Sequence, residues 1–282
     1  MCYNVDMGKH KGFTFIEVAL FMAVTAALFI AIALGMQNAI FRQRYDDSTQ
    51  RFFEFMRSVY SKVSNPQSSG DGSSNYAIYG KLVVFGETTD MLGNAVPSDE
   101  QPIFTYDVVG RADGTLTIST GKAAQLLASL DANVVRFNRN SAGSITGVVL
   151  ASPEEFSVPW AARIENPDRT DVKKSILVVR HPRSGTINTL VYDGVIQANQ
   201  EVKAANEAYS NGGTSTIGNL LKQYLSDGSF NSDYGDINFC VNPYGPGEAG
   251  SFQRRNIRIL NNARNASSVE MIDMDGSDNK CV

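Results

Sequence analysis

The stretch Lys11-Gly12-Phe13-Thr14-Phe15-Ile16-Glu17-Val18 decides how the rest of the chain is organised. It opens an apolar run in which no charged residue occurs between Glu17 and Arg42. Twenty-four residues fill that interval, with one glycine, Gly35, and no proline. As an α-helix they would span about 36 Å, enough to cross a bilayer core of about 30 Å. The sequence therefore predicts a membrane-spanning helix near the start of the chain.

One carboxylate, Glu17, lies at the edge of this apolar run. A charged side chain inside a bilayer costs at least about 2.5–3.5 kcal/mol, so such a group normally has a partner or a function. Lys11 and Gly12 provide the basic flank and the small residue that a protease site at the cytoplasmic face needs. Cleavage after Gly12 would give Phe13 a free amine. That cation has the right size to pair with Glu17 of its own chain or of a neighbour.

The residues from Gly12 to Glu17 resemble the class III signal of type IV pilins and type II secretion pseudopilins, with Phe15 in place of the usual leucine. The resemblance implies cleavage between Gly12 and Phe13 by a prepilin peptidase, N-methylation of Phe13 by the same enzyme, and a role for Glu17 as the buried assembly carboxylate. It implies other pilins or pseudopilins and an inner-membrane assembly platform as partners. The protein would be a single-pass membrane protein with an extracytoplasmic head, assembled into an extracellular or periplasmic filament.

The sequence predicts four consecutive segments. They are a leader over 1–12, a transmembrane or assembly helix over 13–41, an amphipathic stem helix over 42–66 and an extracytoplasmic head over 67–282. Apolar or small residues recur along the stem at spacings of three and four, as expected for a helix that packs on a sheet. They are Phe41, Tyr45, Thr49, Phe52, Met56, Val59 and Val63. Pro66 disfavours helical geometry at Asn65 and so predicts the end of the stem.

Segments rich in β-branched and aromatic residues predict the strands of the head. They are Ala77–Phe85, Ile103–Val109, Thr115–Ser119, Val134–Phe137, Ile145–Leu150, Lys174–Arg180, Thr186–Tyr192, Ile237–Val241, Asn256–Leu260 and Val269–Ile272. Helices are predicted over Lys122–Leu130, Glu201–Tyr209 and Thr216–Leu225. We therefore expect an α+β fold, in which the long N-terminal helix packs on a mainly antiparallel β-sheet head with a helical insertion over 195–235.

The cysteines predict one disulfide. Cys2 would be lost with the leader, which leaves Cys240 and Cys281 as an even pair outside the cytoplasm, where disulfides form. Closing a loop of about 40 residues would stabilise the fold by about 3–4 kcal/mol in the chain-entropy model. These considerations favour a disulfide over two free thiols.

The composition predicts a folded, non-catalytic protein. A hydrophobic content of 43% supports a sizeable core, and a net charge of −4 does not indicate a bulk polyanion-binding protein. No Ser-His-Asp order, Walker loop or Gly-x-Gly-x-x-Gly fingerprint is present. His181 follows a predicted strand and is interpreted as a surface or structural histidine, while Trp160, the one tryptophan, is expected in the core. We therefore predict no enzymatic activity.

Two charged clusters are candidate binding sites. Asp273, Asp275 and Asp278 surround a glycine and offer the oxygen ligands that Ca²⁺ prefers, but the glutamate that ends an EF-hand loop is absent. A solvated turn is therefore favoured, and no cofactor is predicted. A basic cluster could contact nucleic-acid phosphates, but the nearby Glu270 and the three aspartates favour a surface ion network. The cluster consists of Arg254, Arg255, Arg258 and Arg264.

The sequence is consistent with two functions from different classes. The first is a pilin-like structural subunit, of the minor or tip type because the head has about twice the bulk expected of a compact pilin head. The second is a membrane-anchored extracytoplasmic enzyme or binding protein that uses the helix as a tether. A tether needs apolarity alone, so the spacing of Gly12, Phe13 and Glu17 favours the subunit. A pilus, a secretion pseudopilus and a competence apparatus stay open as the type of filament.

Overall fold

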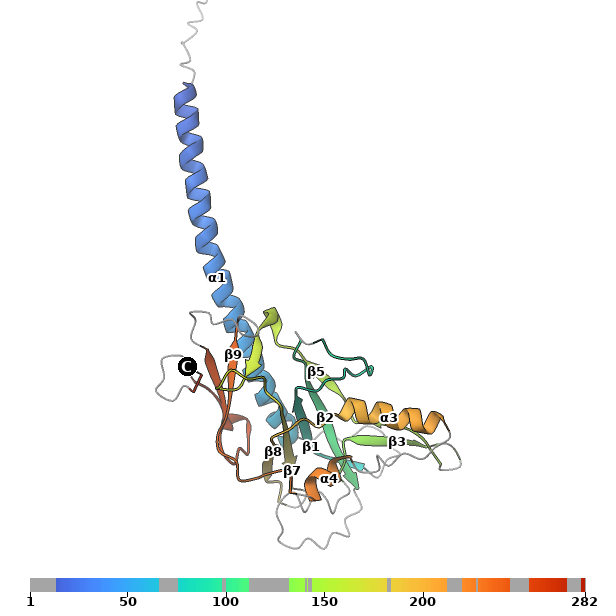
Figure 1. The fold of residues 1–282 in the computed structure, drawn as a ribbon. Coiled ribbons are helices and arrows are strands. Elements are labelled where there is room, and N and C mark those ends of the chain that lie inside the picture. The colour runs from blue at the N-terminus through green and yellow to red at the C-terminus, as the bar shows by residue number, and fades with distance from the viewer. Residues whose placement is uncertain are drawn as a thin grey trace, which may run out of the picture. The chain divides into compact units, whose positions relative to one another are not determined.

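The computed structural model describes residues 14–65, 76–97, 100–111, 132–139, 141, 144–181, 184–211, 220–226, 228–243, 254–272 and 280–281. The chain divides into two compact units, Met1–Asp46 and Asp47–Val282. One helix, α1 (Phe15–Ser64), contributes residues to both units. The second unit combines helices with antiparallel sheets, so the predicted α+β class is confirmed (Figure 1).

Within the second unit, the stem part of α1 is buried along one face. Thr49, Phe52, Met56, Val59 and Val63, which belong to the predicted apolar stripe, are all at most 4% exposed. Phe52 meets the rings of Phe85 and Phe239 edge-on, with centroids 6.3 and 5.6 Å away. The helix ends at Ser64, two residues before Pro66, as the sequence predicted. The stem is therefore a central part of the head's core.

The largest sheet has five antiparallel strands in the order β5-β2-β1-β7-β8. The strands are β1 (Tyr76–Phe85), β2 (Ile103–Arg111), β5 (Glu154–Phe156), β7 (Lys174–Arg180) and β8 (Ile187–Tyr192). Successive side chains of a strand point to opposite faces. On β1, Leu82 and Val84 face one side and Val83 and Phe85 the other, and all four are buried. Because Phe85 packs on Phe52, the stem covers the second of these faces.

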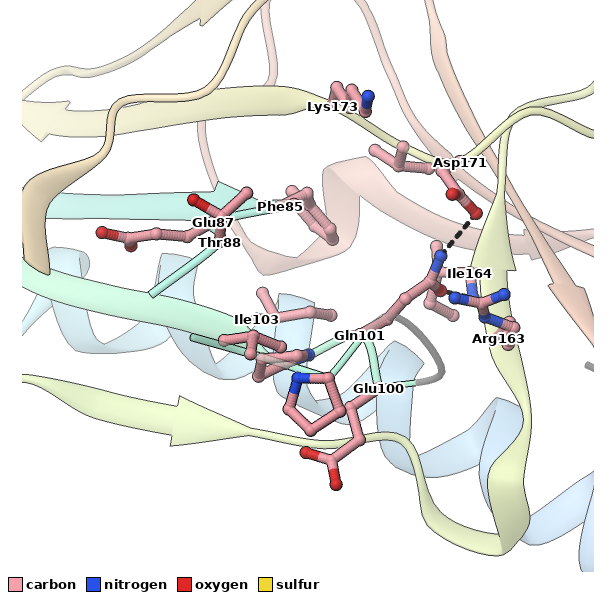
Figure 2. A pocket seen from close by; sticks show the side chains of 15 residues that line it. Phe85, Glu87, Thr88, Glu100, Gln101, Ile103, Arg163, Ile164, Asp171 and Lys173 are labelled. Atoms are coloured by element: carbon pink, nitrogen blue, oxygen red, sulfur yellow. Dashed lines mark hydrogen bonds between the residues drawn. The ribbon is translucent and has the colours of Figure 1, made fainter. Parts of the chain in front are cut away.

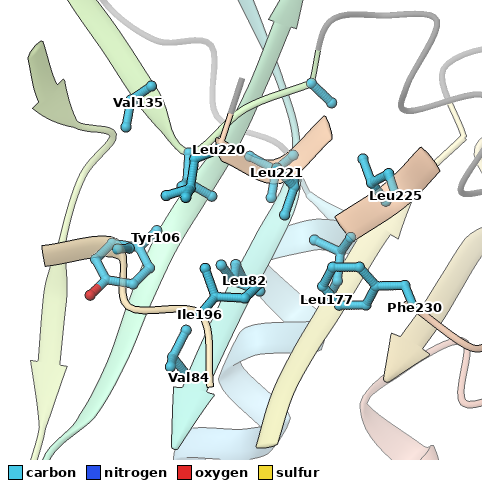
Figure 3. Close-up of a cluster of buried hydrophobic side chains, with 14 of the residues drawn as sticks. Leu82, Val84, Tyr106, Val135, Leu177, Ile196, Leu220, Leu221, Leu225 and Phe230 are labelled. Carbon is cyan, nitrogen blue, oxygen red and sulfur yellow. The ribbon is translucent and has the colours of Figure 1, made fainter. Parts of the chain in front are cut away.

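Helices of the predicted insertion cover the first face. Figure 3 shows Leu220, Leu221 and Leu225 of α4 (Leu220–Ser226) over Leu82 and Leu177 of the sheet. A second helix, α3 (Ala198–Ser210), lies beside a hairpin formed by β3 (Val135–Arg139) and β4 (Ile145–Leu150). The side chain of Asn206 makes two hydrogen bonds of 2.9 Å to the backbone of Val148 in β4. The sheet is thus buried on both faces.

A second antiparallel sheet has the order β11-β10-β9-β6. Its strands are β6 (Arg163–Glu165), β9 (Ile237–Asn242), β10 (Arg255–Ile259) and β11 (Val269–Ile272). Cys240 of β9 forms a disulfide with Cys281, which is the pairing that the sequence favoured. Both cysteines are buried, so the bond attaches the last part of the chain to the interior of this sheet.

Residues 154–160, which we call the strap, run antiparallel along one flank of the stem. The strap contains β5 and the first two residues of a short 3-10 helix over Pro159–Ala161. Four contacts join the strap and the stem in reverse order along the two segments. They are Glu154–Lys62 (2.7 Å), Phe156–Phe55 (ring centroids 4.2 Å), Pro159–Ser48 (2.9 Å) and Trp160–Asp47 (2.9 Å).

A charged network extends from the strap into the sheet. Lys62 Nζ donates to both carboxylate oxygens of Glu154, at 2.7 and 3.0 Å, and Lys81 Nζ donates to one of the same oxygens at 3.3 Å. Lys81 also pairs with Asp107 of the neighbouring strand at 3.0 Å. Burial acts to raise the pKa of Glu154, but the two lysines outweigh it and hold the pKa below its ordinary value. Lys81 and Asp107 are nearly inaccessible, so each depends on the other for compensation of its charge.

The prediction that Trp160 lies in the core is wrong. Its side chain is 54% exposed, because the indole N–H reaches out to the carboxylate of Asp47 on the surface of the stem. The strands β5 and β6 were not predicted, since three residues are too few for alternation to be recognised. Among the described residues, the strands of the head form three sheets. The predicted elements Thr115–Ser119 and Lys122–Leu130 lie outside the described residues.

Candidate assembly site at the start of the apolar helix

The start of α1 holds the sequence's leading site candidates. Gly12 and Phe13 lie outside the described residues, and Thr14 is the first described residue. Glu17 Oε2 accepts hydrogen bonds from the backbone N–H of Thr14 at 2.9 Å and from its hydroxyl at 3.1 Å. The hydroxyl oxygen of Thr14 accepts the backbone N–H of Glu17 at 3.3 Å. Thr14 and Glu17 thus form a reciprocal capping box at the helix N-terminus.

This cap fixes the direction of the Glu17 carboxylate. The side chain turns back toward the N-terminus, where the helix dipole favours a negative charge. Oε2 takes both hydrogen bonds from Thr14, and Oε1 accepts none from any described residue. The role of Thr14 was missed in the sequence, although its signal is present: Thr-x-x-Glu before an apolar run is the signature of a capping box.

The helix that follows is apolar on all sides. Leu20, Phe21 and Met22 are consecutive, so they point in different directions, yet they are 64, 71 and 67% exposed. A helix that is apolar all round belongs in a membrane or in the interior of an assembly. Among the described residues, Phe15–Ala33 is the stretch of helix long and apolar enough to cross a membrane, as a span or as a signal sequence.

The other charged candidates have different outcomes. Asp273, Asp275 and Asp278 lie outside the described residues, and the described part of the chain has no group of three or more potential metal-binding side chains. Arg258 pairs with Glu270 at 2.6 Å, as a surface ion network requires. Arg254, in contrast, does not take part in the predicted surface ion network.

Arg254 is buried and pairs with Glu165 of β6 at 3.2 Å, instead of joining the carboxylates near the C-terminus. Asn242 donates a second hydrogen bond to Glu165 at 2.8 Å. This arginine therefore belongs to the core of the four-stranded sheet and does not form a basic surface. His181 follows β7, and its Nδ1 accepts the backbone N–H of Ser184 at 3.1 Å, which gives it a structural role in that turn.

One cavity of about 150 Å³ opens between the ends of the two sheets (Figure 2). The Gln101 side chain crosses it, donating to Asp171 Oδ1 at 2.7 Å and accepting the backbone N–H of Ile164 at 3.2 Å. Glu87 also lines the cavity, and burial raises its pKa to about 7 despite hydrogen bonds from Tyr106 and Asn199. The Gln101 side chain and the Glu87 carboxyl group are thus hydrogen-bonded to other parts of the fold.

No protein-family model, curated protein or solved structure matches this chain. Its function is therefore inferred from its own residues and geometry.

Proposed function

We propose that this protein is a pilin-like structural subunit, of the minor or tip type, of a type IV pilus or a type II secretion pseudopilus. It is inserted in the membrane through the apolar part of α1, cleaved between Gly12 and Phe13 by a prepilin peptidase and N-methylated at Phe13. An inner-membrane assembly platform then adds it to a filament of other pilins or pseudopilins. The proposal assigns it no catalytic step and no cofactor.

One observation carries this proposal: a carboxylate stands at the start of an exposed apolar helix, and Thr14 orients it. A helix that serves only as a tether gains nothing from Glu17, because a carboxylate opposes insertion in a bilayer. A subunit that packs its apolar helix against others can use the charge to select one alignment.

In the proposed assembly, the amine of Phe13 on an incoming subunit meets Glu17 of a subunit already in place. Thr14 occupies Oε2, so Oε1 remains to receive the cation. In a low-dielectric setting the attraction between the charges is large, and desolvation cancels much of it. The pair therefore contributes to alignment more than to the stability of the head.

The first test is the mature N-terminus. Mass spectrometry of protein purified from its native membrane should find a chain that begins at Phe13 and carries one methyl group on its amine. A chain that begins at Met1 would contradict the proposal, as would a cut after the apolar run.

The second test removes the charge of Glu17. We expect Glu17→Ala and Glu17→Gln to leave cleavage, membrane insertion and head stability unchanged, and to lower incorporation into sheared filaments. Glu54→Gln is the matched control, since Glu54 is an exposed carboxylate of the same helix outside the apolar part. Normal incorporation of both Glu17 variants would contradict the pairing and favour the tether.

A further inference from the structure

Glu87 is a buried carboxyl group that connects three elements of the head. It lies two residues after the end of β1 and is 2% exposed. Its Oε2 accepts the hydroxyl of Tyr106 in β2 at 2.6 Å, and its Oε1 accepts the backbone N–H of Asn199 at 2.5 Å. Asn199 lies in the first turn of α3. One carboxyl therefore joins the end of β1, the middle of β2 and the start of α3.

No described residue forms an ion pair with Glu87. The charged residues Arg163, Asp171 and Lys173 line the same cavity. Figure 2 shows the Glu87 carboxyl extending away from Arg163 and Asp171. The other charged groups on the elements around Glu87 are Glu100 at the cavity, Glu155 of β5, which acts on Tyr106, and Glu201 and Lys203 of α3. An ionised Glu87 is thus a buried charge that only neutral donors compensate, which is costly.

Residues 86–97, which we call the β1–β2 loop, are attached to α3 by further contacts. The side chain of Gln197 accepts the backbone N–H and the hydroxyl of Thr88, and Asn199 Nδ2 donates to the carbonyl of Thr89 at 2.8 Å. Lys203 Nζ donates to the carbonyl of Gly93 at 2.8 Å. Glu87 is the ionisable, buried member of this set.

We infer that Glu87 is a proton-responsive latch: its neutral form holds the β1–β2 loop and the first turn of α3 against β2, and its ionisation loosens that contact. The neutral carboxyl can keep both hydrogen bonds. Its carbonyl oxygen still accepts from Asn199, and its hydroxyl can donate to or accept from Tyr106. When Glu87 is neutral, docking of the β1–β2 loop and the first turn of α3 against β2 therefore buries no net charge.

The direction of the pH dependence follows from linkage. Burial raises the pKa of Glu87 from an ordinary value of 4.5 to about 7 in the docked state. Between these values the undocked carboxyl has lost its proton while the docked one keeps it, so docking weakens as the pH rises. The contact is therefore strongest in acid and weakest above neutrality. This inference concerns the head alone and does not depend on filament assembly.

Hydrogen exchange of the full chain in detergent micelles tests the latch. Opening of α3 amides, corrected for the intrinsic pH dependence of exchange, should increase on the order of a hundredfold between about pH 5 and about pH 8. Amides in the stem should not follow this trend. Glu87→Gln, which is neutral at every pH, should give a flat profile. A flat profile in the wild-type protein, or an equally steep one in Glu87→Gln, would overturn the inference.

Two further variants keep the test decisive if Glu87→Gln folds poorly. Tyr106→Phe removes a donor that lowers the pKa of Glu87, so the opening transition should move to higher pH. Glu54→Gln removes an exposed carboxylate on the stem that accepts a hydrogen bond from Gln50, and should leave the wild-type profile unchanged. An unmoved transition in Tyr106→Phe, or its loss in Glu54→Gln, would show that Glu87 is not the responsible group.

Discussion

The two parts of α1 carry large apolar residues for opposite reasons. In the part before Asp46, Phe21 is 71% exposed, whereas Phe52 in the stem is fully buried between two sheets. From Val18 to Phe41 the first part has no charged residue, and many of its large apolar side chains are exposed. The second part is apolar along one stripe and packs within the head. One helix thus combines an exposed apolar surface with part of an intramolecular core.

The sequence distinguishes these parts by their charges. No charged residue occurs from Val18 to Phe41, while charged residues separate the apolar positions of the stem. Continuous apolarity indicates burial on all sides, and a period between three and four indicates burial on one side. Substitutions of the same residue type in both parts should therefore have very different effects on the head.

The largest expected effect is that of Phe52→Ala. Phe52 contacts the rings of Phe55, Phe85, Phe156 and Phe239, so truncation leaves a cavity at the junction of the stem and both sheets. We expect the free energy of unfolding of the head to fall by about 3–5 kcal/mol. Urea denaturation of the full chain in micelles, followed by near-UV circular dichroism, measures this change.

Phe21→Ala is the matched control in the apolar part. Because the Phe21 side chain is 71% exposed, its truncation should change head stability by less than about 0.5 kcal/mol. A loss from Phe21→Ala as large as that from Phe52→Ala would show that the two parts of α1 do not have separate roles.

The disulfide provides the next largest effect, and it belongs to the head alone. Cys240 and Cys281 are 41 residues apart, so removing the bond should cost about 3–4 kcal/mol in the chain-entropy model. We expect the double variant Cys240→Ser with Cys281→Ser to lower the urea midpoint of the head without changing membrane insertion. Cys2→Ser is the control and should have no effect. Peptide mapping that finds both thiols free in native protein would refute the bond.

Sequence reasoning recovered the long, regular elements of this fold. The stem's burial stripe, its end before Pro66 and strands such as Lys174–Arg180 follow from periodicity, because many residues repeat the same signal. The strap was missed, since its contacts with the stem are made by single side chains of a three-residue strand and a short turn. At the candidate site, the carboxylate was recognised from its position in the apolar run, but its reciprocal cap with Thr14 was not.

A smaller effect is expected from a hydrogen bond that joins the stem to the far strand of the sheet. Thr189 of β8 donates its hydroxyl proton to the carbonyl of Ala263, so it must accept the 3.0 Å hydrogen bond from Tyr60. Tyr60→Phe should therefore cost about 1–2 kcal/mol by leaving a buried acceptor unpaired. Tyr209→Phe is the control, since the hydroxyl of Tyr209 binds no described residue, and should cost less than about 0.5 kcal/mol. Equal losses would contradict the role of this hydrogen bond.

The smallest effect concerns the strap where it meets the stem. Trp160 has φ 63° and ψ 29°, a left-handed conformation that costs a residue with a Cβ about 1–2 kcal/mol. Trp160→Ala and Trp160→Gly both lose the indole and its hydrogen bond to Asp47, but glycine alone adopts this backbone without strain. We therefore expect the glycine variant to be more stable than the alanine variant by about 0.5–1 kcal/mol in urea denaturation.

Ser61, an exposed stem residue with regular helical backbone, is the control site. There the alanine variant should be more stable than the glycine variant by about 1 kcal/mol. If glycine is the more stable variant at residue 160 and alanine at residue 61, the strap retains its left-handed turn in solution. If alanine is the more stable variant at both residues, the turn relaxes once the indole is gone.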